Sequence, residues 1–516
     1  MNNNLKIKDI DLEKKFVKYW IYLLIGVFFV GLVIRLIFLP VNVPLSLDAT
    51  SYLWYALDTK TLGHFPVDYG FPNTGWPQWL SLIFFMIPSS EILDYMSVQR
   101  ISSVIISSLT IFPVFFLCKK YFKISISLIG AFLFSVEPHL ILNSHLGITE
   151  PLFILFIITS IVCVLSENKK LAYLGFALGA LASIVRYEGL LCLFVLSIIF
   201  FISYKTDSKK IIKYILALSI FILVLLPFAY LRIESIQDDG LTSHVVAGIT
   251  TPLLLTENEE NQTIALLIFV FDGLQNLFKY TGWIMIPYFI ILTPIGIISY
   301  FKNKNQNKLI FIISMMVLSI PALYAYSRGI QETRYLLVLM PFFTIFSLFT
   351  IEKIITKYEN KKIIVTIILI VIIASSVGYV NYKKTDTVHE IEAYEIALQV
   401  AKITKVTNAY IPESKYLKVS TIEKNSYPIL SKNIDLPPIT LSTDEYNSIK
   451  DFIENGKNEG LTHIVTDDKQ NRITFLKDLF LHDENYPYLN KVYDSNEHGF
   501  YYHVKIYKID YDKFLN

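Results

Sequence analysis

The residue best placed to do chemistry is Asp48, an acid that directly follows the first long apolar segment of the chain. The loop behind it runs to Trp79 and contains Pro66, Trp76 and Pro77 among other prolines and aromatic residues. Prolines restrict the backbone, whereas flexible connectors are rich in glycine and serine. A carboxylate held in place in this way can act as a general base toward a bound hydroxyl group.

Further ionisable side chains recur at the ends of later apolar segments. They occur in three stretches: Glu137 to Glu150 with His139 and His145, Arg186-Tyr187-Glu188, and Arg328 to Tyr335 with Glu332 and Arg334. Ionisable groups beside hydrocarbon are costly and mark functional sites. Arginine is the side chain whose shape best matches two oxygens of a phosphate. The pattern indicates a site for a lipid phosphate, although any single arginine could instead extend its side chain toward the interface.

One carboxylate opposite several arginines fits the transfer of a sugar from a lipid phosphate. Hydrolysis of a glycoside uses two carboxylates, because its alkoxide leaving group must be protonated. A lipid phosphate leaves as a stable anion, so a base and a group that holds the departing charge are enough. We expect Asp48 to be the base, and Arg334 with Arg186 or Arg328 to hold the phosphate. Direct displacement would invert the anomeric carbon.

The composition indicates that most of the chain lies in a membrane. Of 516 residues 53% are hydrophobic, and the mean hydropathy is +0.48, which exceeds the range of soluble domains. The net charge is only +2 and no basic face is visible, so nucleic acid is not an expected partner. Cys118, Cys163 and Cys192 all lie in apolar segments, which implies no disulfide framework.

Apolar length and flanking lysines predict a multi-pass α-helical membrane protein with about eleven transmembrane helices. We place them at 19–39, 98–118, 125–142, 150–165, 171–185, 189–203, 211–231, 283–301, 309–327, 335–351 and 363–381. A bilayer core needs about 20 apolar residues, so the pair in 171–203 is short. The lysine clusters fall at one side of these helices, which predicts that residues 1–18 are cytoplasmic. Five arginines fall at the opposite side: Arg100, Arg186, Arg232, Arg328 and Arg334.

These helices define a membrane domain over 19–382, followed by a small extracytoplasmic α/β domain over 383–516. Outer loop 40–97 carries Asp48, and its segment 77–88 suits a short interfacial helix. Outer loop 232–282 resembles a lid, because its apolar part 264–278 suits a helix lying on the membrane. In the C-terminal domain we expect helices at 388–404, 443–457 and 472–482, strands at 408–411 and 461–466, and a hairpin from 490–494 and 500–509.

These features together resemble the GT-C superfamily of glycosyltransferases, which use polyprenyl-phosphate-sugar donors. The likeness rests on the acid of the first outer loop and on the sequences at 138–153, 186–189 and 333–341, and it covers about residues 17–382. It is nearest to the protein-mannosyltransferase and lipid A aminoarabinose-transferase branch. It implies a GT-C-like fold, a polyprenyl (dolichyl) phosphate donor, and a protein, lipid or glycan acceptor, as in protein glycosylation at a cell membrane.

The resemblance also assigns roles to single residues. Asp48 matches the catalytic acid of the first loop, Glu150 the acid of the second outer loop, and Arg334 the arginine near the donor phosphate. Many members carry a second acid after the first, but here Ala49 follows. A metal held between paired acids is therefore less expected, and a divalent cation stays open as the one cofactor. The Trp-Trp-Asp-Tyr-Gly motif of the oligosaccharyltransferase catalytic subunit is absent, so that alternative is set aside.

Other side chains complete the predicted site. We expect Tyr335 to join the arginines at the phosphate, and sugar or acceptor contacts from Tyr52, His64, Trp76, His145 and Glu188. Simpler roles stay open for several of these residues.

Asp48 can cap the helix that follows it, and Glu150 suits the dipole of a helix N-terminus. Glu188 can pair with Arg186, and Glu332 with Arg328 or Arg334. His139 and His145 are expected to form hydrogen bonds at the interface, because their spacing from Glu150 matches no known metal site.

The rival class is a polytopic transporter or flippase for a lipid-linked sugar. Such proteins show internal repeats with broken helices and charges near the bilayer midplane. No repeat is visible in this sequence, and its charges gather at one surface. A receptor whose C-terminal domain binds a partner is a third alternative, but the polar residues concentrate in the membrane domain.

Overall fold

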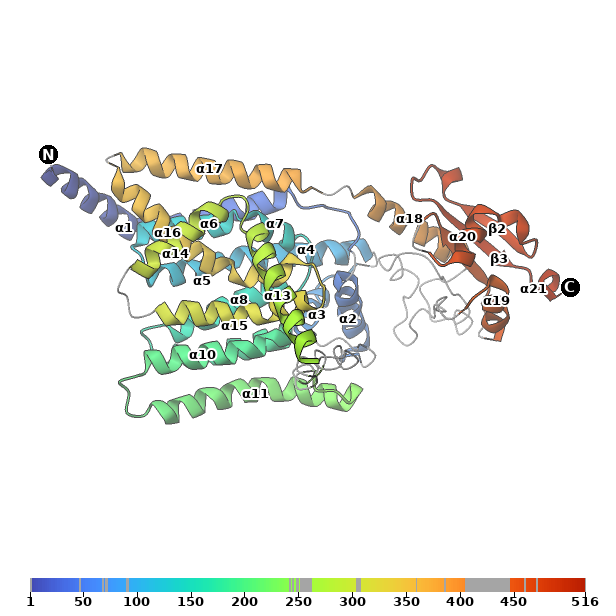
Figure 1. Ribbon diagram of the computed structural model, residues 1–516, viewed down its shortest axis with the longest axis horizontal. Helices are drawn as coiled ribbons and strands as arrows, with labels where there is room; N and C mark the ends of the chain where they lie inside the picture. Colours follow the sequence, from blue (N-terminus) through green and yellow to red (C-terminus); the bar gives the residue numbers. More distant parts are fainter. Residues whose placement is uncertain are drawn as a thin grey trace. The chain divides into compact units, whose positions relative to one another are not determined.

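The described part of the computed structural model is mostly helical, with one small sheet near the C-terminus (Figure 1). The structure describes residues 2–45, 48–66, 69, 73–89, 92–240, 243, 246, 250, 262–302, 308–358, 360–384, 387–403, 446–458, 461–469 and 472–515. The chain divides into two compact units, and each is described by itself. The first comprises Met1–Pro40, Leu62–Ile83 and Val98–Lys384, and the second Val41–Thr61, Phe84–Ser97 and Thr385–Asn516.

The first unit is a bundle of apolar helices. The helices that lie wholly or mainly in it are α1 (Asn2–Ile37), α3 (Gly75–Phe84), α4 (Ile92–Leu109), α5 (Ile111–Lys119), α6 (Ile124–Ser135), α7 (Pro138–Ser144), α8 (Glu150–Val164), α9 (Leu171–Val185), η1 (Tyr187–Gly189), α10 (Leu190–Ser203), α11 (Lys210–Ile236), α13 (Gln262–Ile284), α14 (Phe289–Lys302), α15 (Lys308–Ser327), η2 (Thr333–Leu339), α16 (Met340–Lys357) and α17 (Lys361–Tyr382). Helix α8 packs against α9, α9 against α11, and α14 against α16.

Within the described ranges, seven helices are long and apolar enough to cross a membrane. They span Phe16–Ile37, Ile92–Lys119, Lys210–Glu234, Thr263–Ile284, Ile310–Ser327, Thr333–Lys357 and Lys361–Tyr382. An eighth candidate is the pair α6 and α7, which meet at a bend of 50°. Helices α8, α9, α10 and α14 are apolar but shorter. The multi-pass helical architecture is confirmed, and the number of eleven crossings stays a prediction.

Several of these helices carry lysine at one end and arginine at the other. Helix α9 runs from Lys170 to Arg186, α11 begins at Lys210 and carries Arg232 near its end, and α15 leads from Lys308 to Arg328. Because a helix cannot fold back on itself, the two residue types lie at opposite ends of the bundle, here named the lysine end and the arginine end. This separation was the basis of the predicted phosphate site.

Helix α13 differs from the expected boundaries. The predicted span at 283–301 begins inside it, whereas the structure ends α13 at Ile284 and starts α14 at Phe289. Pro287 lies between the two helices, and a proline lacks the N–H group that a continuous helix needs. Figure 1 shows α13 crossing the direction shared by α10, α11 and α15. Helix α13 is also among the helices long and apolar enough to cross a membrane, so the surface helix expected in loop 232–282 stays a prediction.

Helix α16 is the most buried of the long helices, and almost every residue from Met340 to Ile351 is inside the unit. The 3-10 segment η2 leads directly into it, and Pro341 stands at the start of α16, a position that proline favours. Arg334 and Tyr335 in η2 are therefore attached to the centre of the bundle.

The second unit contains α2 and the C-terminal domain. Its elements are α2 (Asp48–Leu62), α18 (Val388–Ile403), α19 (Ile449–Asn458), β1 (His463–Asp467), α20 (Thr474–Leu481), η5 (Asp483–Asn485), β2 (Leu489–Asp494), η6 (Asn496–His498), β3 (Val504–Ile509) and α21 (Tyr511–Leu515). The strands form an antiparallel sheet in the order β1-β3-β2, with Val465 and Tyr493 both opposite Ile506. The predicted hairpin is confirmed, and the expected strand at 408–411 lies outside the described residues.

Alternation along the strands places apolar side chains on both faces of this sheet. Val465 and Ile506 pack on one face with Ile396 of α18. Ile464 packs on the other face with Phe452 of α19. Both faces are thus covered by helices, as a domain with its own core requires.

His463 makes the stability of this domain depend on pH. Burial on β1, together with the charge of Lys508, lowers its pKa to about 4. Because the unfolded chain binds a proton near pH 6.5 and the folded chain only near pH 4, stability should fall as the pH drops through this window. The loss is on the order of 2 kcal/mol at pH 5. Hydrogen exchange of β1 in the full chain, corrected for intrinsic rates, measures it. The variant His463→Gln should show a flatter profile, and an equally steep one would contradict the assignment.

Candidate functional site

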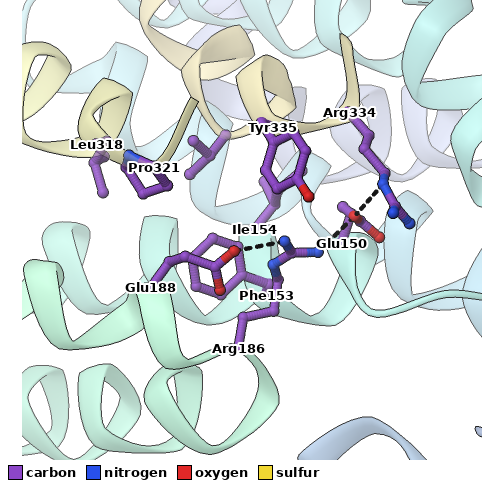
Figure 2. A pocket seen from close by; sticks show the side chains of 10 residues that line it. Glu150, Phe153, Ile154, Arg186, Glu188, Leu318, Pro321, Arg334 and Tyr335 are labelled. Carbon is purple, nitrogen blue, oxygen red and sulfur yellow. Dashed lines mark hydrogen bonds and ion pairs between the residues drawn. The ribbon is translucent and has the colours of Figure 1, made fainter. Parts of the chain in front are cut away.

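Two arginines and two glutamates meet in a small pocket of the first unit (Figure 2). Glu150 opens α8, Arg186 and Glu188 follow α9, and Arg334 lies in η2 beside Tyr335. Figure 2 shows the four charged side chains pointing toward one another. The free space between them is about 20 Å³, which is room for about one water molecule.

Arg186 is held on two sides by carboxylates. Its Nη1 donates to Glu150 Oε1 at 2.6 Å and to Thr149 Oγ1 at 3.0 Å. Its Nη2 donates to Glu188 Oε1 at 2.6 Å. The guanidinium also lies 5.6 Å from the ring centroid of Tyr335, within the range of a cation–π contact. These groups are buried, so Arg186 is the structural centre of the cluster.

The chain around Arg186 is fixed by the segment before α3. Arg186 is extended, with φ −148° and ψ 128°, where α9 ends. Asn73 Oδ1 accepts a hydrogen bond from the Tyr187 backbone N–H at 3.3 Å. A Cβ at Gly75 would lie 2.7 Å from Val185 N, so only glycine allows the start of α3 to approach the end of α9 this closely.

Glu150 is positioned by a clamped loop. Gly147 has φ +70°, a conformation that glycine adopts without strain. Its carbonyl oxygen accepts hydrogen bonds from Trp76 Nε1 at 2.9 Å and Gln99 Nε2 at 2.7 Å. Arg100 Nε donates to the carbonyl oxygen of His145 at 3.0 Å. The loop that ends at Glu150 therefore cannot shift without breaking three buried hydrogen bonds.

Removal of Arg186 should unfold the cluster. Arg186→Gln leaves the buried Glu188 without its cation and Glu150 with only the longer contact to Arg334, and such a loss costs about 3–5 kcal/mol. Thermal and denaturant unfolding of the purified chain in detergent should show a large loss of stability. Arg328→Gln is the matched control, because Arg328 is exposed and stacks on Tyr324. Equal stability of the two variants would contradict the structural role of Arg186.

Arg334 is the more accessible of the two arginines. Its side chain is 24% exposed, and its Nε lies 3.9 Å from Glu150 Oε1. It also forms a short ion pair with Glu332, whose side chain is 50% exposed. Glu188 thus pairs with Arg186 and Glu332 with Arg334, two of the ion pairs that the sequence suggested. Arg328 does not line this pocket, although the sequence grouped it with the other two arginines.

The other predicted site residues of the first outer loop do not line this pocket. Asp48 is exposed in the first turn of α2, and Tyr52 is buried one turn later. Both belong to the second unit. His64 is exposed, with its Nδ1 3.0 Å from the carbonyl oxygen of Phe65. Trp76 has no exposed surface, and its indole N–H donates the hydrogen bond to Gly147 described above.

The histidines near Glu150 form hydrogen bonds, as expected. His145 Nε2 pairs with the carbonyl oxygen of Arg35 at 2.9 Å. Burial lowers the pKa of His145 to about 4, so the ring is neutral near pH 7. His139 lies between Glu137 Oε1 at 2.9 Å and the hydroxyl group of Tyr379 at 3.0 Å.

Sequence reasoning missed Gln99 and Thr149, which support the cluster through Gly147 and Arg186. Gln99 and Arg100 are adjacent polar residues inside the apolar helix α4. Their position could have indicated that Gln99 has a buried hydrogen-bond partner. Sequence reasoning also placed Arg100 among the arginines expected at the phosphate. In the structure, Arg100 donates hydrogen bonds to the backbone carbonyl oxygens of His145 and Pro40. Arg232, another of the five arginines, forms an ion pair with Asp238, with 3.7 Å between Nη2 and Oδ2.

The described residues do not fit a metal ion. Among them, no three His, Cys, Asp or Glu side chains lie close enough to hold one. Glu150 and Glu188 are instead neutralised by Arg186.

No family model matches the chain, and no curated protein matches it in sequence. Solved structures do resemble it. ArnT from Cupriavidus metallidurans, bound to undecaprenyl phosphate, superposes with a TM-score of 0.60 at 10% identity, over 95% of this chain and 98% of that chain. The oligosaccharyltransferase of Archaeoglobus fulgidus, in complex with Zn and sulfate, superposes with a TM-score of 0.59 at 14% identity, over 86% of this chain and 68% of that chain. The archaeal oligosaccharyltransferase AglB from Archaeoglobus fulgidus, in complex with an inhibitory peptide and a dolichol-phosphate, superposes with a TM-score of 0.57 at 13% identity, over 88% of this chain and 70% of that chain.

Both proteins are members of the GT-C superfamily, and the chain has their fold. The aminoarabinose-transferase likeness expected from the sequence is matched by ArnT. The oligosaccharyltransferase was set aside because its motif is absent, yet its architecture is equally similar. At identities of 10–14% the likeness establishes the fold.

Proposed function

We propose that the chain is a membrane glycosyltransferase that moves a sugar from a polyprenyl phosphate to an acceptor hydroxyl group. The observation that carries the proposal is Arg334, a partly exposed guanidinium at the edge of a buried, charge-balanced cluster. Two proteins of the same fold were solved with polyprenyl phosphates, namely ArnT with undecaprenyl phosphate and AglB with a dolichol-phosphate. These ligands support a lipid phosphate as the donor for this chain as well.

The cluster can exchange one anion for another beside Arg334. Arg186 and Arg334 balance Glu150 and Glu188, so Glu332 brings one further negative charge. Because the pocket has room for about one water molecule, a phosphate must displace a group already present. Glu332 is the half-exposed member of the cluster, so it can move into solvent. The exchange of the Glu332 carboxylate for the singly charged phosphodiester of the donor leaves the net charge beside Arg334 unchanged.

The other residues of the cluster have supporting roles in this proposal. Glu150 contacts both arginines and positions Arg334 for the phosphate. Glu188 Oε2 is buried and has no hydrogen-bond partner in the described part of the chain. A buried acceptor oxygen without a partner is costly, so a sugar hydroxyl group can donate to it. Tyr335 lies over Arg186 and limits how far its guanidinium can tilt.

Asp48 supplies the base. Its carboxylate takes the proton of the acceptor hydroxyl as the acceptor oxygen bonds to the anomeric carbon. The bond from that carbon to the phosphate oxygen breaks, and its electron pair leaves with the polyprenyl phosphate. Arg334 stabilises the developing charge, as preorganised cations do at departing groups. The sugar is transferred with inversion of the anomeric carbon.

Glu332→Gln should strengthen donor binding. The substitution removes the anion that competes with the phosphate for Arg334. Partly exposed ion pairs contribute about 0.2–1 kcal/mol, so the affinity for undecaprenyl phosphate should rise by up to about fivefold. Calorimetric titration of the detergent-solubilised protein measures this change. Glu234→Gln, near the end of α11, is a control of equal charge that should leave the affinity unaltered. Weaker binding by Glu332→Gln would show that Glu332 supports the site instead.

The function itself is tested by transfer. Purified protein is added to membranes of a deletion strain together with polyprenyl-phosphate-linked radioactive mannose or glucose. The proposal predicts label in an acceptor and release of free polyprenyl phosphate. A flippase would instead move the intact lipid-linked sugar between leaflets of sealed vesicles. Mass spectrometry of surface glycans from the deletion strain then identifies the missing sugar.

A further inference from the structure

A second, larger cavity lies at the lysine end of the first unit. It is a groove of about 620 Å³ between α1, α6, α16 and α17. The groove is open along one side and is lined mainly by apolar side chains. The groove reaches the opposite end of α16 from Arg334, so it does not belong to the site described above.

The walls of the groove are apolar faces of three helices. Phe16, Leu23 and Val27 share one face of α1, Ile129 lies on α6, and Leu369 lies on α17. From residue 13 to residue 27, α1 rises about 21 Å at 1.5 Å per residue. One leaflet accounts for half of a hydrocarbon core about 30 Å thick. The groove is thus long enough to follow an acyl chain through one leaflet.

The rim of the groove is polar and carries an excess of positive charge. Lys123 precedes α6, and Lys361 and Lys362 begin α17. Two acids share the rim, Glu13 and Glu352. Glu13 is engaged within the protein, since its Oε2 accepts a hydrogen bond from the hydroxyl group of Ser125 at 2.6 Å. The rim thus has a net positive charge, with three lysines and two acids. This charge beside an apolar groove suits a phosphate headgroup that is attached to an acyl chain.

We propose that this groove binds an anionic glycerophospholipid from the leaflet at the lysine end. The phosphate contacts Lys361 and Lys362, with Lys123 across the rim, and an acyl chain lies along α1 and α6. A neutral lipid would fill the apolar walls but gain nothing from the rim. The proposal is independent of the transferase activity.

Native mass spectrometry of the full chain tests the proposal. The protein is purified in detergent with equal amounts of phosphatidylglycerol and phosphatidylcholine of identical acyl chains. Phosphatidylglycerol should be retained preferentially. Each lysine near a phosphate is worth about 1 kcal/mol, so Lys361→Gln/Lys362→Gln should weaken retention about 10–30-fold. Lys209→Gln/Lys210→Gln is matched in charge and begins helix α11 outside the groove, so it should leave retention unchanged.

A second variant tests the apolar walls. Val365→Trp places a large side chain in the groove from α17, and it should abolish retention of both lipids while Lys209→Gln/Lys210→Gln still retains phosphatidylglycerol. Thermal unfolding confirms that each variant is folded. Equal retention of the two lipids, or loss of phosphatidylglycerol in both lysine variants alike, would overturn the proposal. Retention of undecaprenyl phosphate that is lost in Lys361→Gln/Lys362→Gln but kept in Arg334→Gln would also overturn it, because the occupant of the groove would then be the carrier lipid.

Discussion

Replacement of Asp48 by asparagine is expected to lower turnover about 10²–10⁴-fold, the usual contribution of a positioned general base. Asp48 is exposed in the first turn of α2, where it can serve as a base, as a helix cap, or as both. Asparagine caps a helix as well as aspartate does, but it cannot accept a proton from a hydroxyl group. Asp48→Asn therefore removes the base while it preserves the cap.

The matched control is Asp94→Asn. Asp94 is likewise an exposed acid in the first turn of its helix, α4, and it accepts a hydrogen bond from the hydroxyl group of Ser89 at 2.6 Å. Steady-state transfer assays should show full activity for this variant. Donor affinity of Asp48→Asn, measured separately, should stay within about twofold of the parent, a difference below 0.5 kcal/mol. Retained turnover in Asp48→Asn would leave this acid with a structural role only.

Arg334→Gln is expected to reduce kcat/KM for the donor about 10²–10³-fold, the loss typical of removing one group that stabilises charge in a transition state. The substitution should leave the fold intact, because Arg334 is partly exposed and Glu150 keeps Arg186 as its partner. Arg334→Lys keeps the charge but loses the two-pronged geometry that suits phosphate, so it should recover part of the loss.

Arg328→Gln again serves as the control. It removes one arginine from the same end of the bundle, six residues away, without touching the pocket. Kinetic assays with a polyprenyl-phosphate sugar should place it near the parent. The reverse order, with Arg328→Gln inactive and Arg334→Gln active, would move the phosphate site away from the cluster around Glu150.

Much of the architecture could be predicted because lysines and prolines interrupt the apolar segments. The hairpin of the C-terminal domain followed from alternation and from Gly499, which has φ +83° between the two strands. The start of α14 was placed too early because apolar residues continue through the break at Pro287. Hydropathy averages over such a break, and only the backbone at the proline reveals it.

The membership of the site was harder to predict. Arg328 and Arg334 are equally close to an apolar segment in sequence, but η2 carries Arg334 into the pocket while Arg328 stays exposed on the turn after α15. Trp76 looked like a sugar contact because aromatic residues stack on sugars and interfaces alike. Its burial against Gly147 depends on a long-range hydrogen bond, which no local pattern encodes.

A structure of the protein with undecaprenyl phosphate tests the central claim most directly. We predict the phosphate within hydrogen-bond distance of the Arg334 guanidinium, with Glu332 turned away from it and Arg186 still paired with Glu150 and Glu188. A phosphate bound elsewhere, with the ion pair between Glu332 and Arg334 intact, would contradict the account.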